Sequence, residues 1–504
     1  MSMDHISMQH QLLAGITCLL LVHRLVLILY RTQLHPLSRF PGPKLAASTS
    51  LYSHYFNFVQ GGNFIRQLEH LHDTYGPIVR THPNELHIRD MEAYNTVFKV
   101  GSRFEKDPGF YGFPFEGSHF NMVTLKQAKP RRDLLQPHLS KSAVGGVQQV
   151  LEKSVWKFID LLERRRAENR GVDLSLAFRC VTADMFLGYA FSRPLEALSC
   201  PDFKYPPAMN MDAILMASFL AKNFRLPFTV LWRVASSLPP FMLKCLGVSF
   251  VFDFQQDCKN MLLDLIKQKE TKNLPPHPTT MLDSLIAAAE DKSAPMLSIR
   301  DLTSEVVVLL FAGAEAASLT LTLGTYHLLE DRDMLLKLQT ELSAVMADKR
   351  TLPPLAALQR LPYLTGVIKE ALRVAHGAPG KLPRITPQEG ATLCGQRIPP
   401  KTPVSFSHWV YHYDPSIFPD PTRFDPERWI GSKNGDLDKH LLSFSKGSRS
   451  CIGINLAYAE LYLLFASFFR NFEPTLDGTD AEDMEVRDYY APMCNGHLKV
   501  SFAE

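Results

Sequence analysis

The segment FSKGSRSCIG at residues 444–453 leads into an apolar helix pattern that runs from Asn455 to Phe472. A cysteine placed just before a helix has backbone N–H groups that point at its sulfur and stabilise a thiolate. Glycines on both sides of Cys451 permit a tight turn and let a flat ligand approach the backbone closely. Arg449, two residues earlier, is placed to pair with a carboxylate of that ligand. These residues together meet the requirements of a haem site with a single thiolate ligand.

A lone buried cysteine is more often an inert small hydrophobe than a ligand. The pattern FxxGxRxCxG, which begins at Phe444 and ends at Gly453, argues against that alternative. It resembles the cysteine-ligand loop of the cytochrome P450 superfamily of haem-thiolate enzymes. The resemblance implies haem b as the cofactor, with Phe444 and Gly453 beside it. It also implies that Cys451 is the axial ligand of the iron and that Arg449 binds a haem propionate.

Composition limits the class of protein. With 46% hydrophobic and 21% charged residues, the 504-residue chain can build a deep core, which excludes disordered, collagen-like and coiled-coil proteins. A net charge of +3 argues against nucleic acid as a partner. The eight cysteines are far apart and include no CxxC pair, which excludes a zinc ribbon and argues against a disulfide scaffold. We therefore expect a globular protein in a reducing compartment.

The N-terminal region predicts a membrane anchor. Residues 12–30 are nearly all apolar, and a helix of this length spans about 28 Å, close to the hydrocarbon thickness of a bilayer. Arg24 near its middle costs about 2.5–3.5 kcal/mol on insertion, which the apolar neighbours and snorkelling of the side chain can offset. Basic residues follow the segment, so the positive-inside rule predicts a cytosolic catalytic domain. A helix that lies on a membrane or is buried in the protein is the alternative.

A stiff connector follows the anchor, because three prolines and a glycine between His35 and Pro43 exclude a helix there. The resemblance implies a single-pass protein of the endoplasmic reticulum membrane. The predicted organisation is a lumenal N-terminus at residues 1–11, a transmembrane anchor at 12–30, a proline-rich linker at 31–44 and a haem-thiolate catalytic domain at 45–504.

Helical patterns dominate the rest of the chain. Apolar residues recur at three- and four-residue spacing in the segments 150–166, 255–270 and 332–347. A capping box at Ser298–Asp301 predicts the start of a long, mostly apolar helix that crosses the interior and ends near Glu330.

Strand signals are few. Two short strands are predicted at residues 78–81 and 85–88, on either side of a Pro-Asn turn. The fold class expected is mainly α with minor β, in a single large haem domain behind the N-terminal anchor. By resemblance this is the cytochrome P450 fold.

Two further motifs precede the cysteine loop in family order. EALR at residues 370–373 matches the family's ExxR, and FDPERW at 424–429 is similar to its FxPERW. A Glu–Arg pair at this spacing is weak evidence alone, since such pairs occur on many exposed helix faces. By resemblance, Glu370, Arg373 and Arg428 form a buried ion network that holds the cysteine loop, which is a structural role.

The resemblance also implies further basic residues at the haem propionates. Arg384 belongs to a Leu-Pro-Arg segment of the kind that supplies one of them. Residues 128–140 resemble the helix that supplies another, and Arg132 is the residue chosen there, with Arg131 as the alternate. A solvated basic turn is the alternative for this arginine pair.

The long helix contains AGAEAAS at residues 312–318, which is similar to the family's (A/G)Gx(D/E)T(T/S). We expect Gly313 to leave a groove for dioxygen, and Glu315 matches the acid of the motif. The threonine of the motif is replaced by Ala316. Because that hydroxyl helps deliver protons in the family, its loss predicts a substrate with its own hydroxyl or carbonyl near the attacked carbon, or an atypical oxidation.

The resemblance implies a monooxygenase that uses O2 and outside electrons. No nicotinamide or flavin fingerprint follows a strand here, so we expect a membrane-bound NADPH–cytochrome P450 reductase as the donor. Details such as HPLSRFPGPKLA near the start look most like fungal microsomal members that oxidise terpenoids and other secondary metabolites.

We expect a lipophilic substrate, because the pocket of a membrane-anchored enzyme of this kind is apolar. By analogy its walls lie between Phe104 and Leu125 and in residues 205–235. The first segment is rich in aromatic residues, namely Phe110, Tyr111, Phe113, Phe115 and Phe120.

Two alternative functions stay open. The first is a haem-thiolate enzyme that rearranges, dehydrates or desaturates its substrate. The replacement of the motif's threonine by Ala316 leaves this alternative open. The second is a haem sensor or carrier without turnover.

Overall fold

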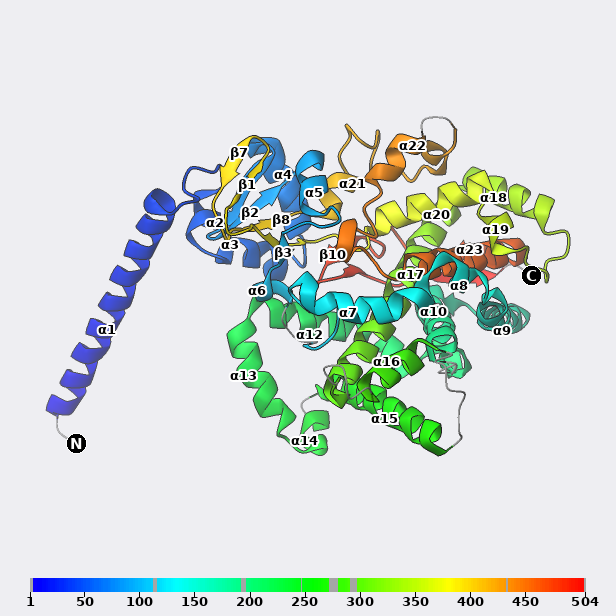
Figure 1. Cartoon of the computed structure of the whole chain (residues 1–504), viewed down its shortest axis with the longest axis horizontal. Coiled ribbons are helices and arrows are strands. Elements are labelled where there is room, and N and C mark those ends of the chain that lie inside the picture. Colours follow the sequence, from blue (N-terminus) through cyan, green and yellow to red (C-terminus); the bar gives the residue numbers. More distant parts are fainter. Residues whose placement is uncertain are drawn as a thin grey trace.

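Helices make up most of the computed structural model, which describes residues 3–111, 116–191, 196–245, 247–271, 280–290, 297–431 and 434–502. The described strands form small sheets of two to five strands. Most of the described elements after the first helix pack into one body (Figure 1). The prediction of a mainly α protein with minor β and one large domain is confirmed.

The first helix, α1 (Met3–Leu29), stands clear of the rest of the protein and continues as a π-helical turn through Tyr30–Leu34 (Figure 1). Three described helices are long and apolar enough to cross a membrane, and of these α1 alone is unburied. The helical conformation passes the predicted end at residue 30 and stops before His35, which is extended. The stop falls there because Pro36 disfavours the helical conformation of the residue before it.

The long central helix is α17 (Ile299–Glu330), and the capping box predicted at Ser298–Asp301 is present. It packs against α10 (Leu174–Phe191), α20 (Pro362–Ala375) and α23 (Ile454–Asn471) (Figure 1). Gly324 lets α23 approach closely, because a Cβ there would lie 2.7 Å from the ring of Phe465. The core of the protein is built around this helix.

The other predicted helices are also confirmed. They are α9 (Gln148–Ala167), α15 (Ser249–Thr271) and α18 (Arg332–Val345). The remaining helices are α2 (Lys44–Ser48), α3 (Leu51–His54), α4 (Phe64–Tyr75), α5 (Met91–Val97), α6 (Pro108–Tyr111), α7 (Leu125–Leu135), α8 (Lys141–Gly145), α11 (Pro206–Met209), α12 (Met211–Asn223), α13 (Arg225–Ser236), α14 (Pro240–Cys245), α16 (Met281–Glu290), α19 (Leu355–Leu358), α21 (His408–His412) and α22 (Asn434–Leu437).

The largest sheet contains both predicted strands, β1 (Ile78–His82) and β2 (Glu85–Ile88), which pair antiparallel. Its strand order is β1-β2-β8-β5-β3, completed by β8 (Pro403–Ser405), β5 (Arg384–Ile385) and β3 (Glu105–Lys106). Strands β3 and β5 place Lys106 and Arg384 opposite each other.

The smaller sheets are made of short strands. They are β6 (Ala391–Leu393) with β7 (Gln396–Ile398), β4 (Val172–Asp173) with β12 (Lys499–Phe502) and β9 (Pro474–Leu476), and the hairpin of β10 (Val486–Asp488) with β11 (Pro492–Cys494).

Candidate active site

The loop before α23 holds Cys451 in a fixed place. The backbone N–H of Cys451 donates to the carbonyl of Phe444 at 2.8 Å, which closes the loop. Gly447 has a φ of +71° and lies against the carbonyl of Phe98, so only glycine fits there. Burial raises the pKa of the Cys451 thiol, and the backbone N–H of Gly453 and the charge of Arg132 oppose that rise. A bound metal ion would keep such a sulfur deprotonated.

Exposed residues occur both on the cysteine loop and on the long helix α17. Although burial affects the thiol, the residue itself is exposed. On α17, which is otherwise mostly buried, Ala312 and Ala316 are also exposed and lie one helical turn apart on one face. The chain thus offers a sulfur ligand and a stripe of small side chains, the donor and the steric room that a haem requires.

Four cations gather next to the cysteine loop: Lys106, Arg132, Arg384 and Arg449. Within the described part of the chain none of them forms an ion pair, and the three arginines lower the pKa of Lys106 further after burial has lowered it. A pocket of about 280 Å³ opens beside them and is lined by Lys106, Arg384 and Arg449 among others. Unpaired cations are the groups that bind carboxylates, so this cluster suits the two propionates of haem.

The individual arginines are placed differently from one another. Arg132 donates to the carbonyl of Ser450 at 2.9 Å, next to Cys451, whereas Arg131 is buried against Glu305 at 3.0 Å. Arg384 donates to the hydroxyl of Tyr111 at 3.1 Å. Arg132 rather than Arg131 therefore belongs to the cation cluster.

Arg449 binds the backbone of a neighbouring segment. Its guanidinium donates to the carbonyl oxygens of His119, Met122, Val123 and Thr124 at 2.6–3.1 Å. His119 in turn contacts Glu305 of α17 through its Nδ1 and its backbone N–H. The segment thus ties the cysteine loop to α17, a connection that the sequence motifs did not predict because the partners are far apart in the chain.

The ExxR residues form a buried network. Glu370 accepts from Arg373 at 2.7 and 3.0 Å, from Arg428 at 3.1 Å and from the indole of Trp429 at 2.8 Å. Arg373 also donates to the carbonyl of His412. Burial alone would raise the pKa of Glu370, but the two arginines outweigh it and hold the pKa below its usual value.

The motif on α17 divides between two faces of the helix. A Cβ at Gly313 would lie 2.5 Å from the ring of Phe186 on α10, so this glycine lets α10 and α17 pack closely, and the groove for dioxygen expected there stays a prediction. Glu315 is buried and pairs with Arg179 of α10 at 3.0 Å, while its Oε2 atom has no partner among the described residues. Arg179 also pairs with Asp212.

No side-chain hydroxyl of this part of α17 is free beside Ala316. The hydroxyl of Ser318 donates to the carbonyl of Glu315 at 2.9 Å, and that of Thr320 donates to the carbonyl of Ala316 at 2.8 Å. Burial raises the pKa of Glu315, although Arg179 opposes this. At the position of the motif's threonine, α17 therefore presents only the methyl group of Ala316.

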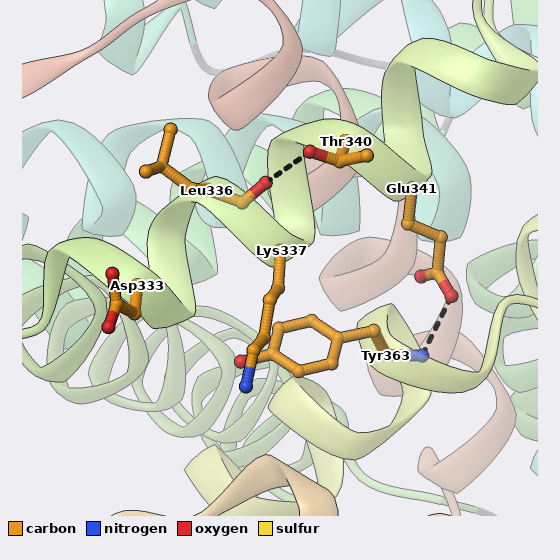
Figure 2. Close-up of a pocket in the computed structure, with 6 residues that line it drawn as sticks. All are labelled: Asp333, Leu336, Lys337, Thr340, Glu341 and Tyr363. Atoms are coloured by element: carbon orange, nitrogen blue, oxygen red, sulfur yellow. Dashed lines mark hydrogen bonds between the residues drawn. The ribbon is translucent and has the colours of Figure 1, made fainter.

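A separate pocket of about 540 Å³ lies on the outer surface, between α18 and the start of α20 (Figure 2). It is lined by Asp333, Lys337, Glu341 and Tyr363, among others. Glu341 accepts the backbone N–H of Tyr363 at 2.9 Å, so this carboxylate is used within the fold. None of the predicted site residues lines this pocket, and it is not the place where the chemistry is expected.

Comparison with known proteins agrees with the site. The family model described as cytochrome P450 matches residues 43–493. The chain belongs to the cytochrome P450 family. Among its relatives, the cytochrome P450 monooxygenase astB of Aspergillus terreus is 33% identical over 91% of this chain and 90% of its own length. The monooxygenase MO6277 of Ascocoryne sarcoides is 34% identical over 92% of this chain and 93% of its own length. The monooxygenase aflU of Aspergillus parasiticus is 32% identical over 93% of this chain and 93% of its own length.

These relatives are fungal P450 monooxygenases, and the similarity covers nearly the whole chain. The protein is therefore a P450 monooxygenase of the fungal type, and its cofactor is haem held by the thiolate of Cys451. Lys106, Arg179 and Asp212 belong to this region although the motifs did not single them out. Phe113 and Phe115, predicted as pocket wall, lie outside the described residues.

Proposed function

We propose that this P450 hydroxylates or otherwise oxidises a lipophilic, terpenoid-like molecule in fungal secondary metabolism, with O2 and electrons from a membrane-bound NADPH–cytochrome P450 reductase. The single observation that carries the oxidation is the exposed residue Cys451, just before α23, in a chain whose exposed Ala312 and Ala316 leave room for cofactor and substrate. The substrate class and pathway are supported by the resemblance to fungal enzymes.

In this proposal the residues of the chain have distinct roles. Haem bound at Cys451 supplies the oxygen-activating chemistry. Arg132, Arg384 and Arg449 orient it through its propionates, Arg449 also by fixing the neighbouring segment. The network around Glu370 keeps the cysteine loop rigid and touches no reacting group.

Proton delivery is the step that Ala316 changes. The hydroxyls of Ser318 and Thr320 are bound to helix carbonyls, and Glu315 is held by Arg179. We therefore propose that a hydroxyl or carbonyl of the substrate, or water that it orders, relays the proton in place of the missing threonine.

The test is the substitution Ala316→Thr, with NADPH consumption and oxidised product measured together in the reductase-coupled enzyme. If the substrate relays the proton, the added methyl and hydroxyl groups displace it, and we expect the fraction of electrons recovered in product to fall about three- to tenfold. The adjacent Ala317→Ser, at a buried position, is the matched control. An unchanged or increased coupling in Ala316→Thr would show that the substrate is not the relay.

The first alternative is a rearrangement, dehydration or desaturation, which the bare methyl of Ala316 also permits. Product formed under ¹⁸O-labelled dioxygen separates the reactions, because hydroxylation incorporates the label and these alternatives do not. A haem sensor or carrier would show no steady consumption of NADPH with reductase and substrate present.

We further propose that the protein is anchored by α1 in the endoplasmic reticulum membrane with the catalytic domain in the cytosol. The apolar helix α13 supports a membrane beside the domain: none of its side chains is buried, and Leu226, Val230, Leu231 and Val234 are exposed. In Figure 1, α1 and α13 project from the same side of the molecule. An amphipathic helix of this kind lies at a bilayer surface.

Vesicle flotation tests this arrangement. Removal of residues 1–34 leaves α13 as the contact, so we expect the shortened protein to bind phosphatidylcholine vesicles weakly. The further change Leu226→Glu with Leu231→Glu should abolish the remaining binding. The substitution Leu336→Glu, at another exposed leucine, is the control and should change nothing. Equal binding of the doubly substituted and unsubstituted forms would contradict the role of α13.

A further inference from the structure

Lys222 in the last turn of α12 is a half-buried cation for which the described residues provide no ion pair. Its Nζ lies 3.3 Å from the ring centre of Phe110 and 4.8 Å from that of Tyr490. No hydrogen-bond acceptor and no ion pair for this ammonium occur in the described ranges. Attraction to the two aromatic rings replaces only part of its lost hydration. Burial accordingly lowers the pKa of Lys222 to about 7, although the charge of Asp488 opposes this.

Tyr490 provides a second unsatisfied polar group at the same place. Its hydroxyl oxygen is buried and has no partner in the described part of the chain. The residue lies in the turn between β10 and β11 and has a φ of +80°, a conformation that costs free energy for a tyrosine. Its backbone N–H donates to Asp488 at 3.1 Å, which fixes the turn. The fold therefore holds this phenol beside Lys222 at the expense of strain.

Phe110 and Lys222, which contact each other, lie in the two segments where the walls of a substrate pocket were expected. Phe110 belongs to the predicted wall at residues 104–125, and Lys222 to that at residues 205–235. Phe110 contacts the ring of Tyr111 at 4.8 Å, and the hydroxyl of Tyr111 accepts from Arg384 of the cation cluster. The aromatic pair thus joins Lys222 to the cofactor end of the site.

The hairpin of β10 and β11 also comes near Glu315 of α17, at Cys494. Cys494 on β11 is close enough to Glu315 and Arg179 for their charges to act on its thiol. From Cys494 to Tyr490 the chain advances four residues, or about 13 Å if extended.

The charges around Lys222 leave room for an anion. Asp488, Lys381 and Glu85 act on its ammonium, and none of them is within ion-pair distance. Asp488 is buried, and burial raises the pKa of its carboxyl while Lys222 opposes the rise. An ammonium donor and a phenol donor, neither with an acceptor among the described residues, match the two oxygens of a carboxylate, and a bound carboxylate would favour the charged form of Lys222.

We propose that Lys222 and Tyr490 bind a carboxylate on the lipophilic substrate and thereby fix which carbon faces the reactive centre. This inference rests on the proposed function, since it names the substrate class of the same site. Lys222 acts as a specificity residue. Phe110 holds its side chain in place.

Calorimetric titration of the full-length, haem-loaded protein tests the proposal. The probes are adamantane-1-carboxylate and its methyl ester, which share an apolar cage and differ in charge. We expect wild-type protein to bind the acid at least tenfold more tightly than the ester. Lys222→Met should lower the affinity for the acid at least tenfold and leave that for the ester within twofold.

Two further variants test the role of the Tyr490 hydroxyl and control for the loss of one charge. Tyr490→Phe removes only the unpartnered hydroxyl, so it should lower affinity for the acid two- to fivefold without changing the melting temperature. Lys259→Met, at an exposed lysine of α15, is the matched control for loss of one charge and should change neither affinity. If Lys222→Met does not fold, the acid-to-ester ratio of the wild type and the effect of Tyr490→Phe decide.

Equal affinities of the wild type for acid and ester, or an equal loss of both in Lys222→Met, would overturn the proposal. The titration needs neither reductase nor O2. Its failure would therefore leave the proposed oxidation standing. A protein that binds the acid selectively and yet oxidises no substrate would count against the proposed function alone.

Discussion

Two of the buried carboxylate–arginine networks in the described part of the chain, those around Glu370 and Glu315, differ in completeness. Around Glu370, both carboxylate oxygens accept hydrogen bonds, from Arg373, Arg428 and Trp429. Around Glu315, one oxygen is paired with Arg179 and the other has no partner among the described residues. The pKa of Glu370 is held below its usual value, and that of Glu315 lies above it.

The difference distinguishes a carboxylate that stabilises the fold from one that is free to contact a ligand. A buried carboxylate with every acceptor site filled has nothing left to offer a ligand, so Glu370 holds the fold. A buried carboxylate with a spare oxygen costs free energy unless something outside the chain uses it, so Glu315 is a candidate for contact with substrate or water. Among the described residues, the ammonium of Lys222 has no ion pair and the hydroxyl of Tyr490 has no partner, so both groups are incomplete in the same sense.

The largest effect expected on stability follows from breaking the complete network. Glu370→Ala leaves Arg373 and Arg428 as buried cations without their carboxylate. We expect the free energy of unfolding to fall by about 3–5 kcal/mol, because removal of one partner of a buried ion pair strands the other. Urea denaturation followed by circular dichroism measures this.

Glu427→Gln is the matched control, because Glu427 pairs with Lys337 in the same region but both side chains are more than half exposed. An exposed pair contributes no more than about 1 kcal/mol. If Glu370→Ala costs no more than Glu427→Gln, the network around Glu370 does not hold the cysteine loop.

A smaller effect concerns the pH dependence of stability, which has opposite signs for Glu370 and Glu315. The lowered pKa of Glu370 means that its stabilisation is present above pH 4.5 and is lost as the pH falls. The raised pKa of Glu315 means that its contribution is present below pH 4.5 and is lost as the pH rises through the raised value. Melting temperatures between pH 3.5 and pH 8 should therefore vary less on the acid side in Glu370→Gln and less on the neutral side in Glu315→Gln. Identical profiles for both variants would contradict the comparison.

The sequence predicted the fold where the signals are local. The capping box at Ser298–Asp301 and the apolar pattern after it predicted α17, and the prolines after His35 predicted the end of the anchor helix within a few residues. These features depend on neighbours in the chain, so spacing and residue type were sufficient. The cysteine loop was predicted for the same reason.

Features that depend on distant partners could not be predicted in this way. The packing of Phe186 of α10 against Gly313 is indicated by no local pattern. The contacts of Arg449 with the segment at residues 119–124, and the position of Lys222 between two rings, likewise arise only when the chain folds. Such groups acquire their role from tertiary contacts.

The central claim is that the sulfur of Cys451 binds the haem iron. The most direct measurement is the absorption spectrum of the reduced protein under carbon monoxide, for the wild type and for Cys451→Ser. We predict the red-shifted carbonyl band of thiolate coordination in the wild type and its loss in the variant. A wild type without that band, or a variant that keeps it, would contradict the account.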